Sequence, residues 1–265
     1  MGPARLWIDG ERLVQWFTRR TESQVRDSQA RNVHAEEERT ILELNTFLAG
    51  LQQRFAAPPP VIAFSDPAHF RKRLFPDYQA FSHLDTRGSV LARGLTQYLR
   101  RNLHCEWFAG MESVDVLGVL STAPRPEPFR GIAVTTHPLM HTVPGEWMDW
   151  QSGQVHEVSA READRNFYRQ VLLGYAADNI EGLSGLTHEA ADACLPAEME
   201  GAVDCEEHPA AWHRGMWKAV AAAYHQRGAN AEQALRCARG VRVLRFEDYD
   251  FKNRKVKLWT PPALS

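Results

Sequence analysis

The sequence predicts an α/β protein whose buried sheet carries acidic residues along one edge. Three short apolar runs have the composition of buried strands: 6–8, 61–65 and 131–136. The first two runs are followed directly by Asp9 and Asp66. Because open α/β sheets bind their ligands at the carboxyl ends of the strands, this edge is the predicted site.

Composition sets wide bounds on the class of protein. The 265 residues are 44% hydrophobic and 24% charged, as in an ordinary globular protein with a sizeable core. The net charge of −2 neither requires nor excludes a nucleic-acid partner, because local patches matter more than the sum. No apolar stretch resembles a signal peptide or a membrane span, so the sequence predicts neither.

The segment 111–118 places acidic residues at the start of an otherwise apolar helix. Glu112 and Asp115 fit an ordinary role there, as caps and as partners of the helix dipole. Together with Asp9 and Asp66, however, they form a group of hard oxygen ligands at one edge of the sheet. Such a group predicts a divalent-metal site of the Mg²⁺ kind, which enzymes use on phosphate esters.

Hydrophobic periodicity and turn residues predict the remaining elements. In chain order they are a helix within about 21–55, a helix from Tyr168 into a glycine-rich turn, a helix at about 211–226, a short helix capped by Asn230, and a hairpin joining 241–246 to 256–260. The glycine-rich turn can expose backbone N–H groups that bind phosphate.

Charge is unevenly distributed along the chain. Residues 71–101 hold seven basic and two acidic side chains, which suits either a solvated helical face or phosphate contacts. Residues 181–207 hold eight acidic side chains and no Lys or Arg. The second segment is expected to repel DNA unless its charges point elsewhere.

Several motifs in order resemble one family, the 5′-3′ exonucleases of short-tailed phages, a branch of the flap-endonuclease (PIN-like) superfamily. The motifs are Ile8-Asp9-Gly10, Phe64-Ser65-Asp66, Phe70-Arg71-Lys72, Phe75-Pro76-Asp77-Tyr78, Met111 to Gly118, Thr142-Val143-Pro144-Gly145, Gly174 to Gly185, Val243 to Phe251 and Val256 to Trp259. Their order and spacing make the resemblance specific, and it runs nearly from end to end.

The resemblance implies a central, mainly parallel sheet flanked by helices, with a helical arch at about 67–103. A nuclease-type core would occupy 1–170, and a helix-three-turn-helix-like region with the C-terminal helices and hairpin would occupy 171–265, packed as one unit. Five carboxylates match the family's metal ligands: Asp9, Asp66, Glu112, Asp115 and Asp178. Five positions match DNA contacts: Arg71, Lys72, Arg73, Gly182 and Gly185.

Five other positions depart from the family where its catalytic groups stand. Val114 replaces a carboxylate of E-x-D-D, His137 and Leu139 replace both carboxylates of D-x-D, Tyr175 replaces the first carboxylate of G-D-x-x-D, and Gln79 replaces the arch lysine. The pair His137 and His141 is interpreted as structural, because Pro138 prevents an ordinary helix from facing them together. One Mg²⁺ or Mn²⁺ is the most that the remaining ligands would hold.

These departures favour a catalytically degenerate pseudonuclease, which binds a host or phage protein and has DNA as a second ligand. Two alternatives stay open: a residual metal-dependent 5′-3′ exonuclease or flap endonuclease, and a non-catalytic protein that binds double-stranded or flapped DNA. The resemblance places the protein in the cytoplasm of a phage-infected bacterial cell.

Overall fold

A six-stranded sheet forms the centre of the molecule. The computed structural model describes residues 4–26, 33–78, 90–125, 129–196 and 209–263. In spatial order the strands are β3 (His104–Glu106), β2 (Val61–Ala63), β1 (Ala4–Asp9), β4 (Arg130–Val134), β5 (Gly145–Met148) and β6 (Val155–Val158). Every neighbouring pair is parallel except β5 and β6, so the predicted mainly parallel sheet is confirmed.

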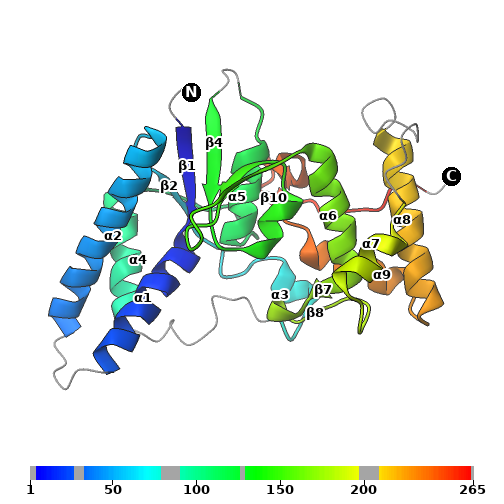
Figure 1. Ribbon diagram of the computed structural model, residues 1–265, viewed down its shortest axis with the longest axis horizontal. Helices are drawn as coiled ribbons and strands as arrows, with labels where there is room; N and C mark the ends of the chain where they lie inside the picture. Colours follow the sequence, from blue (N-terminus) through cyan, green and yellow to red (C-terminus); the bar gives the residue numbers. More distant parts are fainter. Residues whose placement is uncertain (1–3, 27–32, 79–89, 126–128, 197–208, 264–265) are drawn as a thin grey trace.

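Side chains along β1 point alternately to the two faces of the sheet, and they show what covers each face. Leu6 and Ile8 pack into the cluster that holds the apolar faces of α1 (Gly10–Arg26), α2 (Val33–Phe55) and α4 (Val90–Asn102). Trp7 points the other way, into a cluster with α5 (Ser113–Thr122). Figure 1 shows α1, α2 and α4 gathered at one end of the molecule, with α5 beside the sheet.

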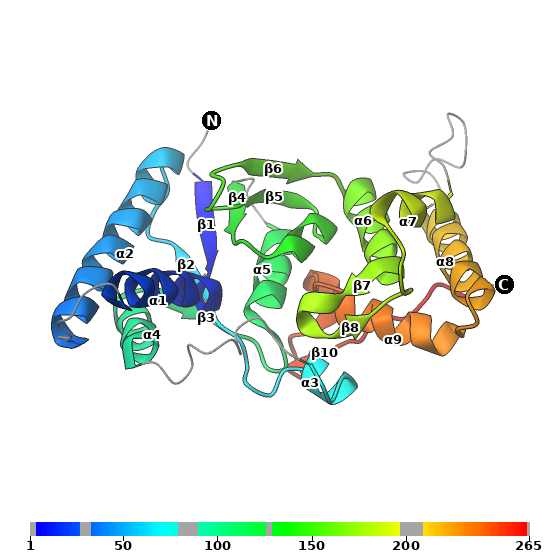
Figure 2. The ribbon, with the colours of Figure 1, turned by 60° about the horizontal axis from the view of Figure 1, so that its bottom comes forward.

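The other end of the molecule is helical. A third apolar cluster joins α6 (Ala160–Leu173), α7 (His188–Cys194), α8 (Pro209–Gln226) and α9 (Ala231–Val241). Figure 1 and Figure 2 show these four helices gathered at that end. The predicted cap is confirmed, because Asn230 and Gln233 exchange side-chain to backbone hydrogen bonds of 2.9 Å at the start of α9. Since α6 packs on α8 and α9, the division at residue 170 stays a prediction.

The C-terminal hairpin exists, but its first predicted arm was wrong, and of the second predicted arm Val256 is paired. The hairpin pairs β9 (Tyr249–Asp250) with β10 (Lys255–Val256). Residues 242–245, expected to form the first strand, are buried and pair with no strand. Their backbone instead bonds to side chains: the Arg242 carbonyl accepts from Arg71, and the Leu244 N–H donates to Asp115. The alternation of apolar residues in this segment therefore results from its burial and not from a place in a sheet.

The predicted arch region contains α3 (Arg71–Leu74) and α4. Gln79, the position of the family's arch lysine, lies outside the described residues. Among the helices that the structure describes, none is long and apolar enough to cross a membrane.

Candidate functional site

Asp9 lies at the carboxyl end of β1 and is completely buried. One of its carboxylate oxygens accepts hydrogen bonds from the Arg12 N–H (3.2 Å) and the Ser113 hydroxyl (2.9 Å). The other accepts from the Thr135 hydroxyl at 2.9 Å and lies 3.8 Å from Arg12 Nε. Asp9 thus joins β1 to the start of α5 and to the end of β4.

Asp66, the second predicted strand-end carboxylate, shapes a loop. Its two oxygens accept hydrogen bonds from the backbone N–H groups of Ala68 (2.9 Å) and Gly110 (2.7 Å). Gly110 has a φ of +79°, a conformation that glycine adopts without strain. Asp66 therefore holds the turn that follows β3, and both of its oxygens already have protein donors.

Arg71 is the centre of the site, and it is 2% exposed although it belongs to a run of three basic residues. Its guanidinium donates to both oxygens of Asp115 (2.5 and 2.9 Å) and to Glu112 (2.8 Å). It also donates to the backbone carbonyls of Gly240 (2.7 Å) and Arg242 (2.6 Å). Burial would lower the pKa of Arg71, but the two carboxylates outweigh burial and hold this pKa well above its ordinary value.

Glu112 is the N-terminal cap of α5, as predicted, and it shares a capping box with Asp115. Burial raises the pKa of Glu112 to about 7, and Arg71 opposes this shift. The Tyr78 hydroxyl donates to Glu112 at 2.6 Å and also lies 3.2 Å from Asp178. Tyr78 therefore connects two predicted carboxylate positions, Glu112 and Asp178, and Arg71 joins Asp115 to the same network.

Packed side chains occupy the described positions at which the sequence departs from the family's motifs. Val114 and Leu139 are buried in the apolar cluster beside α5. His137 caps the short helix η3 (Pro138–Thr142), where its Nδ1 accepts from the Leu139 N–H, so its structural role is as predicted. Burial lowers the pKa of His137 well below its ordinary value, and Arg12 lowers it further. The neutral ring lies beside the half-buried ring of Tyr175, with their centroids 5.6 Å apart.

The positions predicted to contact DNA differ in exposure. Arg71 is enclosed by protein and does not face a surface, which corrects its predicted role. The Lys72 amine donates to the Pro67 carbonyl at 2.7 Å, whereas Arg73 is exposed. Gly182 packs against Gly174, and a Cβ on it would lie 2.2 Å from the Gly174 nitrogen. Gly185 is exposed with a φ of +70°.

Within the described part of the chain, no group of three or more His, Cys, Asp or Glu side chains is placed to hold a metal ion. The structure brings Glu112, Asp115 and Asp178 together, but it places cationic and hydroxyl donors among them. The sequence reasoning missed Arg12 and Tyr78. Arg12 lies in the first turn of α1, three positions after Asp9 at the end of β1, and this short spacing signals an ion pair.

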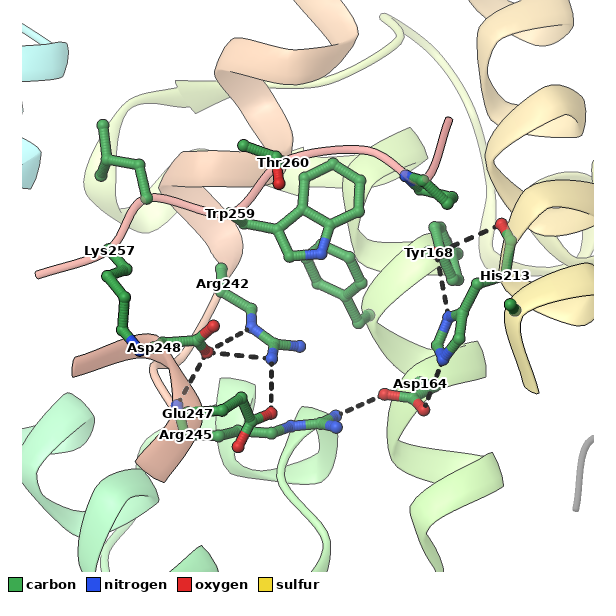
Figure 3. A pocket seen from close by; sticks show the side chains of 14 residues that line it. Asp164, Tyr168, His213, Arg242, Arg245, Glu247, Asp248, Lys257, Trp259 and Thr260 are labelled. Carbon is green, nitrogen blue, oxygen red and sulfur yellow. Dashed lines mark hydrogen bonds and ion pairs between the residues drawn. The ribbon is translucent and has the colours of Figure 1, made fainter. Parts of the chain in front are cut away.

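A separate polar pocket of about 440 Å³ lies between α6, α8 and the C-terminal segment. Figure 3 shows Arg245 and His213 reaching Asp164 from opposite sides, at 2.7 and 3.5 Å. Burial lowers the pKa of His213, although Asp164 opposes this shift. None of the predicted site residues is among the described residues that line this pocket, and Arg242, which does line it, accepts a hydrogen bond from Arg71 through its carbonyl.

Comparison with known proteins gives two sequence relatives. The chain is 22% identical over 233 residues to the exonuclease of Escherichia phage T7 and 21% identical to the exodeoxyribonuclease of Enterobacteria phage T3. Each alignment covers 79% of this chain and 76% of the relative. No family model matches the chain.

Solved structures of the phage T5 enzyme share the fold. A T5 flap endonuclease in a complex with DNA and metal ions superimposes with a TM-score of 0.60 at 11% identity, covering 91% of this chain and 89% of that one. The T5 protein crystallised with metal ions gives 0.58 over the same coverage. The chain is similar in sequence to the phage exonucleases and has the fold of the T5 flap endonuclease.

The T5 structures include complexes with metal ions, zinc among them. In this chain the guanidinium of Arg71 lies between Glu112 and Asp115.

Proposed function

We propose that this chain is a pseudonuclease, which does not hydrolyse DNA and acts by binding a protein partner, with DNA as a second ligand. The observation that carries the proposal is the position of Arg71. A buried guanidinium lies against Glu112 and Asp115 and supplies the positive charge that a divalent ion would otherwise bring.

A resident divalent ion does not fit this arrangement. Mg²⁺ binds through charged oxygens that replace part of its water shell. The oxygens of Asp9 and Asp66 already accept protein donors, and Arg71 engages both oxygens of Asp115. An ion at Asp115 would have to displace the buried guanidinium of Arg71. Without metal activation of water, phosphodiester hydrolysis loses several kcal/mol of transition-state stabilisation, or roughly a thousandfold in rate.

The replaced positions support the same proposal. Val114 and Leu139 are core residues, and His137 caps a turn as a neutral ring. Side chains of other chemistry thus fill the places where the family's ligands stand and contribute to packing. Restoring one carboxylate would therefore not restore the site.

A protein partner is favoured over DNA for the acidic part of the chain. Glu181 and Glu189 are exposed there, and Asp192 is paired with Arg165 and Arg169. A basic protein surface complements such a region, whereas a phosphate backbone does not. DNA contact is favoured elsewhere, because α4 carries exposed arginines at 100 and 101.

The test is digestion of 5′-labelled nicked and flapped duplexes with Mg²⁺ or Mn²⁺, beside an Asp9→Ala variant purified identically. We expect both proteins to leave the DNA intact. Cleavage by the wild type but not by the variant would overturn the proposal and support the residual metal-dependent exonuclease. Equal trace cleavage by both proteins would identify a contaminating nuclease, and the wild type would count as inactive.

A further inference from the structure

An aromatic cluster connects the loop after β3 to the C-terminal hairpin. The ring of Phe108 lies 5.5 Å from that of Tyr249 and 5.7 Å from that of Phe251. Phe251 also contacts Tyr249, at 5.0 Å, and Phe246, at 4.9 Å. The rings of Phe108, Tyr249 and Phe251, together with the Trp107 ring, which lies against Arg254 of the same hairpin, are called the aromatic platform below. Tyr249 is buried, so the Phe251 ring that packs on it has a fixed support.

The outer rings of the platform are open to solvent. Trp107 is 52% exposed and Phe251 is 43% exposed. Among the described residues, the other exposed large hydrophobic side chains are Leu42 and Val90, which are aliphatic and lie on α2 and α4. Scattered exposed apolar side chains are normal, but two exposed aromatic rings that both adjoin one hairpin are typical of a binding surface: Phe251 belongs to the hairpin, and Trp107 lies against its Arg254.

Cations surround the platform. The Arg254 guanidinium lies 5.8 Å from the centre of the Trp107 ring. Arg254 has a φ of +53°, an uncommon conformation for a residue with a side chain, and it projects from the tip of the hairpin. Lys252 and Lys255 are exposed on the same hairpin. Residues 251–258 contain four basic side chains and no acidic one.

The loop that presents Trp107 is held from the opposite side by Asp66. The Asp66 carboxylate accepts the Gly110 N–H, and the Phe70 N–H donates to the Gly110 carbonyl at 2.9 Å. A Cβ on Gly110 would lie 4.0 Å from the guanidinium of Arg73, so this exposed cation borders the same loop. Asp66 therefore has a role in this chain that needs no metal: it fixes the loop of the platform.

We propose that the aromatic platform binds single-stranded DNA, with bases stacked on Trp107 and Phe251 and phosphates near Arg254, Lys252 and Arg73. Exposed aromatic faces bordered by cations match the two parts of a single strand, its bases and its backbone. A duplex offers phosphates but keeps its base faces inside the stack. This inference rests on the DNA-binding part of the proposed function and adds a surface that is separate from the carboxylates.

The test measures binding of the full chain to a fluorescent oligothymidylate by anisotropy at low salt, beside a duplex of equal length. We expect Trp107→Ala and Phe251→Ala each to weaken single-strand binding about tenfold. Trp107→Phe, which keeps an aromatic face, should lose less. Arg254→Ala should weaken binding and reduce its dependence on salt. Leu42→Ala, another exposed apolar truncation, is the matched control and should bind like the wild type.

Two results would overturn the inference: wild-type protein that does not bind the oligothymidylate, or platform variants that bind it as tightly as the wild type does. Equal weakening of duplex and single strand would also overturn it, because stacking acts on single strands alone. Thermal unfolding of each variant separates lost binding from lost folding. Cleavage in the nuclease assay would overturn the pseudonuclease proposal but would leave this binding result intact.

Discussion

The guanidinium of Arg71 and the carboxylate of Asp115 form two parallel hydrogen bonds, of 2.5 and 2.9 Å, in the buried centre of the molecule. Asp115 also accepts the N–H groups of Glu112 and Leu244, at 3.1 Å each. This one pair therefore connects α3, α5 and the segment after α9. A buried ion pair with this many partners is costly to break, because the remaining charge has no water around it.

Replacing Arg71 by alanine is expected to lower the free energy of unfolding by about 3–5 kcal/mol, because Glu112 and Asp115 would stay buried without their cation. Equilibrium unfolding in urea measures the loss. Arg73→Ala, two positions away and exposed, is the control and should change stability little. A loss below about 1 kcal/mol for Arg71→Ala would contradict the role given to this pair.

Removing Arg71 should also make the melting temperature of the protein depend on divalent metal ions. In Arg71→Ala the oxygens of Glu112 and Asp115 lose their guanidinium partner, and a divalent cation can take its place. We expect Mn²⁺ to raise the melting temperature of this variant while leaving that of the wild type unchanged. An equal rise in both proteins would mean that the ion binds elsewhere or beside Arg71.

Stability should depend on pH through Glu112. Burial raises the pKa of this carboxyl from 4.5 to about 7 in the folded chain. Between these values the folded state holds a proton that the unfolded state has lost, so stability is full below pH 4.5 and falls as the pH rises to about 7. At about 1.4 kcal/mol per pKa unit, the loss is about 3 kcal/mol at most.

Glu112→Gln isolates this effect, because glutamine has no proton to lose. Unfolding in urea at about pH 5 and about pH 8 should show a smaller decline in the variant than in the wild type. Parallel declines in both proteins would assign the pH dependence to other groups.

Gly118 is expected to tolerate no side chain. A Cβ there would lie 2.3 Å from the Leu244 carbonyl oxygen, which belongs to the buried segment after α9. Gly118→Ala should therefore destabilise the protein by about 1–3 kcal/mol through overpacking. Gly215→Ala, in α8 with nothing within 4 Å of the new Cβ, should instead stabilise it by about 0.5–1 kcal/mol. Thermal unfolding of the two variants tests the contrast, and equal shifts would contradict it.

Local patterns were sufficient to predict the sheet edge and the caps. The runs before Asp9 and Asp66 form β1 and β2, and Glu112 and Asn230 cap the helices expected of them. Strand β3 was not predicted, because three residues with one exposed side chain carry little periodic signal.

The contacts of the site could not be read from the sequence in the same way. Arg71 stands between His69 and two further basic residues, a context typical of a solvated surface. Its buried partners lie 41 to 171 positions away along the chain, and no spacing rule links such distant positions. Asp66 illustrates the same limit: its place after a strand predicts a metal ligand, but no local pattern predicts the hydrogen bonds from the Ala68 and Gly110 N–H groups to its oxygens.

The two hydrogen bonds that join Arg71 to its most distant partners in the sequence also bear on how the protein folds. Its bonds to the Gly240 and Arg242 carbonyls close loops of 169 and 171 positions. Contacts so distant form late, since closing a long loop costs entropy before any bond repays it. During synthesis, Arg71 cannot reach its final partners until nearly the whole chain has left the ribosome. A chain that stops before residue 240 would leave this arginine beside its carboxylates with two of its donors unmatched.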